Sequence, residues 1–164
     1  FGCGTGHNLI ALREIFPQKK YFGLDYAKFS QKILSLINKK HKNISGANFN
    51  ITKPSEFELN SNSGVFTCGA LEQVGLEYIN FFEYLKLNKP KVVINFETMH
   101  ELYNNSNISD YLSKEYLSKR NYLKNYLTFL RKKEELKIIQ ILQCKRVFGS
   151  QFHEGYSFVC FKFV

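Results

Sequence analysis

The stretch Phe1-Gly2-Cys3-Gly4-Thr5-Gly6-His7-Asn8 places three glycines at alternate positions, directly ahead of a helical pattern. Glycine has no side chain, so it permits a tight turn and a close approach of the backbone to a ligand. The spacing is G-x-G-x-G, because His7 stands where a dinucleotide fingerprint has its third glycine. No Gly-Lys-Ser/Thr follows, as it would in a P-loop. The stretch therefore predicts a strand-to-helix turn that holds a nucleotide-like ligand.

A second signal is Asp25, which ends the apolar run 21–24 and lies 19 residues beyond Gly6. In nucleotide-binding βαβ units, an acid about 20 residues after the glycine turn accepts hydrogen bonds from the ribose hydroxyls. The alternative is a helix N-cap, because a helical pattern follows directly. Taken together, the glycine turn and the acid predict a nucleotide-binding unit.

These two motifs resemble those of the class I S-adenosylmethionine-dependent methyltransferases, and the resemblance extends through most of the chain. It implies an α/β fold of three layers, with a doubly wound, mostly parallel sheet that ends in an antiparallel strand pair. It also implies S-adenosyl-L-methionine as the cofactor. The family carries a whole strand ahead of these glycines, so we expect residues 1–164 to be a single domain from which most of the central first strand is missing.

Apolar periodicity predicts an alternation of helices and strands along the rest of the chain. A strand that begins at Gly64 is expected to run into a turn near Gly69. The other expected elements are a helix from Leu9 to Phe16 that Pro17 stops, a strand at 20–25, a helix at 27–40, a strand at 44–51, a helix at 76–88, a strand at 91–96, a helix at 109–136, and an antiparallel pair at 138–145 and 156–163.

The resemblance also implies which residues contact the cofactor. In the family, an Asp or Asn just beyond the third strand contacts the adenine amino group, and Asn50 is the best positional match. Asn48 is the second match, and a turn-forming role is the alternative for either residue. The expected cofactor-binding residues are Gly2, Cys3, Gly4, Gly6, Asp25, Tyr26, Asn50, Ile51, Cys68 and Gly69, of which the last two would border the transferable methyl group.

Polar residues also follow the strand that begins at Gly64 and the strand at 91–96, where ligands sit in open α/β sheets. We expect His100 to be the catalytic base for a hydroxyl acceptor. The substrate-binding residues expected here are Glu72, Gln73, Glu97 and Glu101. For Glu72 and Gln73, the alternative is the solvated start of a helix. The E-x-x-H spacing of Glu97 and His100 lacks a third ligand, so no metal site is predicted.

Two positions late in the chain complete the predicted site. Arg120 and Tyr122, with Asn121 and Tyr126, would form a polar and aromatic patch if they face the cleft, although a helical Tyr also fits a core. His153, in the connection between the last two strands, is the second candidate catalytic base, and a solvated loop histidine is its alternative.

Composition narrows the class of protein. The chain has 164 residues and is 44% hydrophobic, which suits one domain. Its net charge of +9 favours an acidic partner, but the basic clusters lie near predicted element ends, where solvated helix termini explain them. The four cysteines form no C-x-x-C pair, so reduced thiols are expected. No apolar run is long enough to span a membrane and no signal peptide is visible, so a cytoplasmic protein is expected.

The predicted function is an S-adenosylmethionine-dependent methyltransferase that acts on a small molecule, such as a sugar or natural-product hydroxyl. The D-P-P-Y and N-P-P-Y tetrapeptides of many amino-group methylators do not occur. The alternatives are an RNA methyltransferase, which only the net charge favours, and a non-catalytic binding module. A nicotinamide-dependent oxidoreductase is disfavoured by His7 and by the antiparallel ending. The sequence leaves the oligomeric state open.

Overall fold

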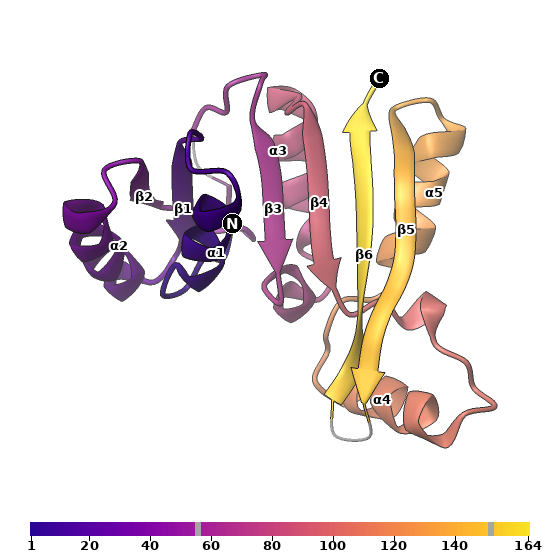
Figure 1. Cartoon of the computed structure of the whole chain (residues 1–164). Coiled ribbons are helices and arrows are strands. Elements are labelled where there is room, and N and C mark those ends of the chain that lie inside the picture. Colours follow the sequence, from indigo (N-terminus) through magenta and orange to yellow (C-terminus); the bar gives the residue numbers. More distant parts are fainter. Residues whose placement is uncertain (55–56, 151–152) are drawn as a thin grey trace.

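A computed structural model describes residues 1–54, 57–150 and 153–164, with the backbone alone described for 148–150 and 153–155. The strands form two sheets (Figure 1). In the two-stranded sheet, β1 and β2 are parallel, and in the four-stranded sheet of order β3-β4-β6-β5 the pair β3–β4 is parallel and the other two pairs are antiparallel. The strands are β1 (Tyr21–Asp25), β2 (Ile44–Asn48), β3 (Gly64–Cys68), β4 (Val92–Glu97), β5 (Ile139–Ser150) and β6 (His153–Phe163).

Helices connect the strands, and local sequence explains several of their ends. Pro17 lies just beyond the first helix, and Lys89, with φ 44°, ends the third helix ahead of Pro90. The Asn107 side chain caps the fourth helix by accepting the amides of Ser109 and Asp110. The helices are α1 (His7–Ile15), α2 (Lys28–Lys40), α3 (Tyr78–Asn88), α4 (Ile108–Lys119) and α5 (Tyr126–Glu135), with short 3₁₀ turns η1 (Leu71–Val74) and η2 (His100–Leu102).

The expected helix at 109–136 is wrong, because the structure has two helices there, α4 and α5. Asn121 and Asn125 adopt left-handed backbone angles, with φ 55° and 56°, which a continuous helix does not allow. Between them, the amide of Leu123 donates to the carbonyl of Glu72 at 2.7 Å. This tertiary hydrogen bond draws the connection toward the sheet. The strand expected at 44–51 is also shorter, since β2 ends at Asn48.

The main core lies between the four-stranded sheet and the helices α3 and α5, which Figure 1 shows behind it. Aromatic rings join these layers. Phe82 contacts Phe129 of α5 edge to face at 4.9 Å, and Tyr78 contacts Tyr126 at 5.0 Å. Figure 1 also places α4 at the end of the molecule where β3 and β4 finish. No helix within the described residues is both long and apolar enough to cross a membrane.

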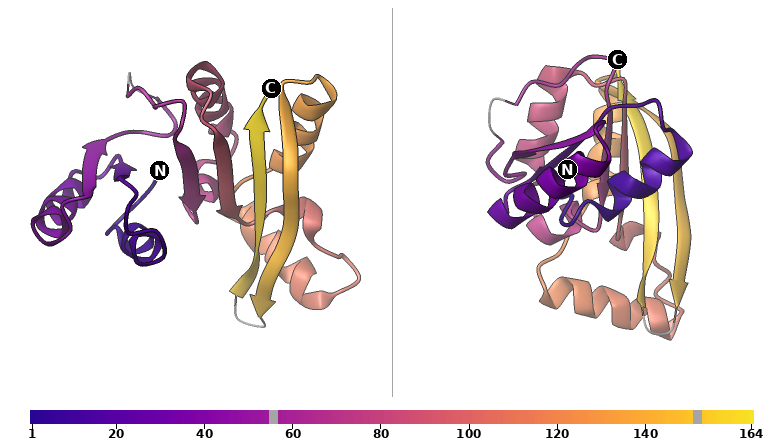
Figure 2. Two further views of the ribbon diagram at one scale, coloured as in Figure 1. Left: turned by 45° about the horizontal axis from the view of Figure 1, so that its top comes forward. Right: turned by 60° about the vertical axis from the view of Figure 1, so that its left-hand side comes forward.

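A cavity of about 950 Å³ separates the two sheets, lined by β1 and β3 and by side chains of α1. Among the described strands, β1 pairs only with β2, and β3 pairs only with β4. In the left view of Figure 2, the indigo and purple part with β1 and β2 stands to one side of the larger sheet. The first residues bridge the two edges: Phe1 N donates to Phe66 O at 2.8 Å, and Gly2 N donates to Leu24 O at 2.7 Å.

Candidate functional site

The glycine turn has the backbone geometry that its sequence predicts. Gly2, Gly4 and Gly6 all have left-handed φ angles, 64°, 51° and 80°. A Cβ on Gly2 would lie 2.3 Å from the Cβ of Ala70, so this turn and the one after β3 are in direct contact. A Cβ on Gly4 would meet nothing within 4 Å. The backbone at Gly4 therefore faces open space, where a ligand can approach closely.

Asp25 ties this turn to the next helix. Its side chain is only 7% exposed at the end of β1. One carboxylate oxygen accepts the Gly4 amide at 2.8 Å and the other accepts the Ala27 amide at 2.8 Å. Ala27, rather than Asp25, is the N-cap residue of α2. Because each carboxylate oxygen can accept two hydrogen bonds, one acceptor position on each oxygen is left over after these two amides.

Of the residues expected around adenine, some bond to neighbouring loop residues and one lies against the glycine turn. Asn50 accepts the amide and hydroxyl of Thr52, both at 2.9 Å, which is the turn-forming role held as its alternative. Asn48 donates to the carbonyl of Tyr26, whose own ring is 74% exposed. Ile51 is buried, and its Cδ1 would lie 3.7 Å from a Cβ on Gly2. Of these residues, Ile51 has the most direct contact with the glycine turn.

Two cysteines lie beside the glycine turn. Burial raises the pKa of Cys3 to about 11, and burial also raises the pKa of Cys68 at the end of β3. Both thiols are therefore protonated at neutral pH. The Asn8 side chain hydrogen-bonds to the thiol of Cys68, which links the start of α1 to β3. Sequence reasoning did not select Asn8, because an Asn at a helix start is common.

Gly69 follows β3 in a left-handed conformation, with φ 61°. A Cβ there would approach the Tyr156 hydroxyl to 3.2 Å. The Gln73 side chain donates to the Gly69 carbonyl at 2.7 Å, so in this structure Gln73 stabilises the turn. The turn after β3 is thus held by a side chain of η1 and lies close to Tyr156 of β6.

Glu97 and Glu72 are buried, and each binds backbone amides of the other's loop. The Glu97 carboxylate accepts the amides of Ala70 at 3.4 Å and Glu72 at 3.0 Å. The Glu72 carboxylate in turn accepts the amide of Thr98 at 3.3 Å. Burial is the main reason why the pKa of Glu97 rises to about 7. These two acids hold the loops after β3 and β4 against each other.

His100 lies three residues beyond Glu97, in η2. Its Nε2 atom is buried and has no hydrogen-bond partner within the described part of the chain. Its ring lies parallel to that of Tyr103, with centroids 6.5 Å apart. Burial lowers the pKa of His100, so its neutral form prevails at neutral pH and can accept a proton. Glu101 is engaged elsewhere, because it accepts the Thr128 amide in the first turn of α5 at 3.1 Å.

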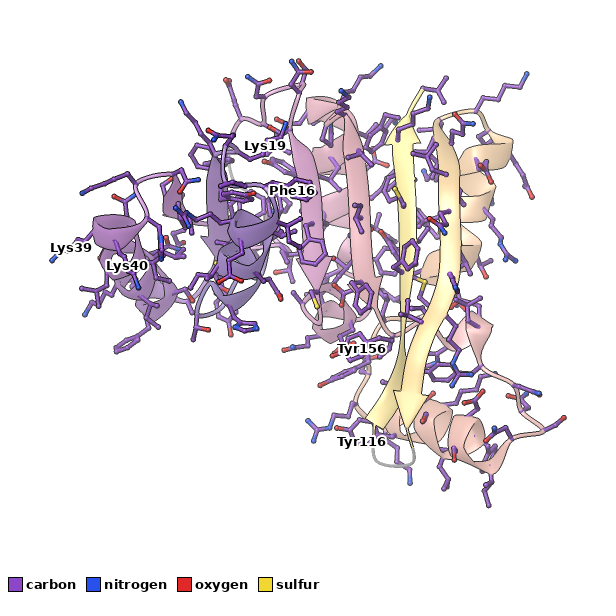
Figure 3. The ribbon with its side chains drawn as sticks, in the orientation of Figure 1. Phe16, Lys19, Lys39, Lys40, Tyr116 and Tyr156 are labelled. Carbon is purple, nitrogen blue, oxygen red and sulfur yellow. The ribbon has the colours of Figure 1, made fainter. Side chains whose placement is uncertain are left out.

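The expected aromatic patch exists only in part. The Arg120 guanidinium lies 5.1 Å from the centre of the Tyr116 ring, and Tyr122 meets that ring edge to face at 6.4 Å. Figure 3 labels Tyr116 at the α4 end of the molecule. Tyr126 does not join the patch, because it is 3% exposed and donates to Asn95 at 2.6 Å. The side chain of His153 lies outside the described residues.

Direct contacts join the glycine turn and the ends of β3 and β4 into one site. Gly2 touches Ala70, Ala70 donates to Glu97, and Glu72 accepts from Thr98. Parallel strands bring their carboxyl ends to one edge, which explains why residues far apart in sequence meet there. Within the described ranges, no three His, Cys, Asp or Glu side chains are grouped so that they could hold a metal ion.

No protein-family model matches this chain, and no curated protein matches it in sequence. Its fold, however, matches solved structures. The mitomycin 7-O-methyltransferase MmcR matches with a TM-score of 0.74 at 9% identity, over 99% of this chain and 47% of MmcR. A second match is geranyl diphosphate C-methyltransferase from Streptomyces coelicolor A3(2), solved in complex with Mg²⁺, geranyl diphosphate and S-adenosyl-L-homocysteine. Its TM-score is 0.68 at 9% identity, and the match covers 99% of this chain and 69% of that enzyme.

A protein described as a pericyclic reaction enzyme matches with a TM-score of 0.69 at 10% identity, over all of this chain. This chain spans only 42% of that protein and also 42% of LepI, which was solved in complex with S-adenosylmethionine. At such identities the likeness concerns the fold. The parallel strands, the antiparallel ending and the glycine turn agree with it. The chain has the class I methyltransferase fold.

Proposed function

We propose that this chain binds S-adenosylmethionine across the glycine turn and serves as the cofactor-binding part of a methyltransferase. The hydrogen bond from the Gly4 amide to Asp25, at 2.8 Å, carries the proposal. It joins a left-handed glycine turn to an acid at the end of the next strand, the pairing that nucleotide-binding units use for phosphate or ribose groups. The fold of solved methyltransferases supports the same function.

The residues present fit this cofactor. Gly4 faces open space, and Asp25 keeps acceptor positions for ribose hydroxyls. When bound, S-adenosylmethionine supplies a methyl group that its sulfonium activates. The chain's own residues then have to align the acceptor and exclude water. Neutral His100 is proposed to take the proton of an acceptor hydroxyl at its buried Nε2, with His153 as the second candidate.

The proposed acceptor is a small molecule, such as a sugar or natural-product hydroxyl. The names of two structural neighbours point the same way, since MmcR acts on mitomycin and the other on geranyl diphosphate. Arg120 and Tyr122 of the α4 patch are the proposed acceptor contacts. Four of the expected substrate-binding side chains instead form hydrogen bonds to backbone groups, so we propose that they stabilise the loops around the site. They are Glu72, Gln73, Glu97 and Glu101.

The proposal includes a strand between β1 and β3. Both facing edges lack a partner among the described strands, and the cavity between them is lined by apolar side chains of α1. Phe1 and Gly2 donate alternately to the two edges, as successive residues of a central strand do. An extended segment leading into Phe1 would continue this pairing. Such a strand between β1 and β3 would hold the glycine turn in place through its backbone hydrogen bonds.

A second candidate is a protein that binds S-adenosylmethionine without transferring its methyl group. The observation that favours it is the structural neighbour described as a pericyclic reaction enzyme, since the fold alone does not imply methyl transfer. An RNA acceptor is the third candidate, and the net charge of +9 is its support. Loss of RNA affinity at raised salt, with demethylation of the cofactor, would favour it.

The test is calorimetric titration with S-adenosylhomocysteine and, separately, NADH, on the protein extended at its N-terminus. The variant is Asp25→Asn, which keeps the side-chain shape but removes the charge. Its control is Glu14→Gln, the same change at an exposed position of α1. We expect S-adenosylhomocysteine alone to bind, and Asp25→Asn to weaken it by about tenfold or more through loss of charge-assisted hydrogen bonds. Binding of NADH, or equal affinity in Asp25→Asn, would overturn the proposal.

A further inference from the structure

A cluster of buried polar side chains lies under the carboxyl ends of β3 and β4. Each member is at most 5% exposed, although burial of polar groups costs free energy unless they are hydrogen-bonded. The hydroxyls of Thr98 and Ser157 have no partner within the described residues. The members are Thr67, Glu72, Asn95, Glu97, Thr98 and Ser157.

The hydrogen bonds in this cluster point in one direction. The Tyr126 hydroxyl donates to Asn95 Oδ1 at 2.6 Å, and Asn95 Nδ2 donates to Thr67 Oγ1 at 2.9 Å. Since the Thr67 oxygen accepts from Asn95, its own proton is available for Glu97, to which it is hydrogen-bonded. The chain of donors therefore ends at the Glu97 carboxylate.

Glu97 connects this hydrogen-bonded cluster to the turn after β3. It accepts the amides of Ala70 and Glu72, and Ala70 lies against Gly2 so closely that a Cβ on Gly2 would come within 2.3 Å of it. A shift of Ala70 must therefore move the glycine turn or open a gap beside it. The carboxylate of Glu97 and the glycine turn are separated by this one residue.

We propose that Glu97 is a positioning residue: by holding the amides of Ala70 and Glu72, it fixes the turn at 69–72 against the glycine turn, where the methyl group of the bound cofactor would lie. This inference rests on the proposed function for its last step. The geometry of the turn itself does not depend on the ligand.

The electrostatics of Glu97 give this role a pH signature. Burial raises its pKa to about 7, opposed by the hydrogen bonds from Thr67 and the amides, while the charge of Glu72 raises it further. Among side chains, the other titratable groups that interact with Glu97 are the Cys68 thiol and the Tyr126 phenol. Burial raises the pKa of both above their ordinary values, so Glu97 is the side chain of the three that changes charge near neutral pH.

The test follows backbone amide NMR signals of Ala70 and Glu72 from about pH 5 to about pH 9, together with the Kd for S-adenosylhomocysteine. In the unaltered protein, both amides are expected to titrate with a common midpoint near 7, and the Kd to change about threefold or more over the same range. In Glu97→Gln, which keeps the volume but cannot ionise, both profiles should be flat.

Thr67→Val is the second variant, and it remains informative if Glu97→Gln does not fold. It removes the proton donor to Glu97, so the midpoint of both amide titrations should move to higher pH. Thr98→Val is the matched control, because it removes a neighbouring buried hydroxyl that has no partner within the described chain. Its titration should equal that of the unaltered protein.

Three results would overturn the inference: amides that do not titrate, amides that titrate equally in Glu97→Gln, or a Kd that stays constant while the amides titrate. Failure of the proposed function gives a different pattern. The unaltered protein would then bind no S-adenosylhomocysteine at any pH. The amide titration would still decide whether Glu97 fixes the turn.

Discussion

The two sheets of this molecule differ in how completely they bury their apolar residues. In the four-stranded part, Val93, Val159 and Phe161 are 0% exposed, and α3 contributes five buried side chains. In the two-stranded part, α1 has no buried residue, and Phe16 and Phe22 are 53% and 54% exposed. The part that carries the glycine turn thus has the weaker core of its own.

Part of the apolar surface of the two-stranded part faces the cavity between β1 and β3. The exposed Phe16 and Phe22 and the half-buried Leu9 and Leu12 line it, whereas the exposed Ile15, Phe29 and Leu36 lie elsewhere. Figure 3 shows Phe16 and Lys19 close to this gap, with Lys39 and Lys40 at the far end of α2. The last two lie in the final helical turn, where cations are stabilised by the helix dipole. The apolar surface that lines the cavity, more than the charge, therefore marks where this part needs a partner.

The largest expected contrast comes from removing one phenylalanine ring in each part. Phe161→Ala should lower the free energy of unfolding by about 3–5 kcal/mol, because the ring is fully buried against Phe82 and Phe163. Phe22→Ala should cost less than about 1 kcal/mol, since Phe22 is 54% exposed. Urea unfolding measures both. Equal losses would mean that the two parts are packed equally well.

A second contrast lies at the contact between the two parts. Gly2→Ala would place a Cβ 2.3 Å from that of Ala70 and strain a left-handed residue, so a loss of about 3 kcal/mol is expected. Gly4→Ala carries only the backbone strain, of about 1–2 kcal/mol, because nothing lies within 4 Å. Thermal or urea unfolding of the two variants compares them. A Gly4→Ala variant as unstable as Gly2→Ala would contradict the direct contact with Ala70.

The smallest expected effect concerns α4, which Asp110 ties to the four-stranded sheet. Both carboxylate oxygens bond to Arg146 at 2.6 Å, and one also accepts the Asn104 amide at 2.8 Å. Because the Arg146 side chain is 35% exposed, Asp110→Asn should cost only about 1–2 kcal/mol at neutral pH. The exposed pair Glu83–Lys86 is the control, and Glu83→Gln should change stability by less than about 0.5 kcal/mol.

The pH dependence of Asp110 follows from the same bonds. Hydrogen bonding from Arg146 is the main reason why the pKa of Asp110 lies below its ordinary 3.8. The stability it contributes is therefore fully present above about pH 3.8 and is lost as the pH falls through the lowered pKa. Unfolding curves of the unaltered protein and Asp110→Asn should converge in acid. Curves that stay parallel would contradict the ion pair.

Most elements were predictable because their signals are local. The periodicity ahead of Pro17 and the strand that ends in Asp25 lie in continuous stretches, and both were found close to their expected bounds. The antiparallel ending was found too, but β5 continues to Ser150 and β6 begins at His153, which was expected in the connection. The split of 109–136 was not predictable. It depends on the left-handed Asn121 and Asn125 and on the hydrogen bond from Leu123 to Glu72, which is 51 residues away in sequence.

The site divides in the same way. The sequence correctly predicted that Asp25 lies next to the glycine turn, because only one helix and one short strand separate the two along the chain. It assigned Glu97 to substrate, whereas the structure places its carboxylate on the amides of a buried turn. Thr67 and Asn95 escaped notice, although they are polar residues at paired positions of adjacent apolar strands. Tyr126 was expected in the polar and aromatic patch, whereas it is buried and donates to Asn95.

The sequence by itself determined most of the order of helices and strands, the left-handed glycine turn and the acid that joins it, since these follow from backbone freedom and short-range periodicity. Only the tertiary structure decided which polar side chains are buried together and which strand edges face the cavity. Those features depend on contacts between residues far apart in the chain, such as Asn95 with Tyr126 and Gly2 with Ala70. Such contacts exist only after the sheets have packed, because no local propensity specifies them.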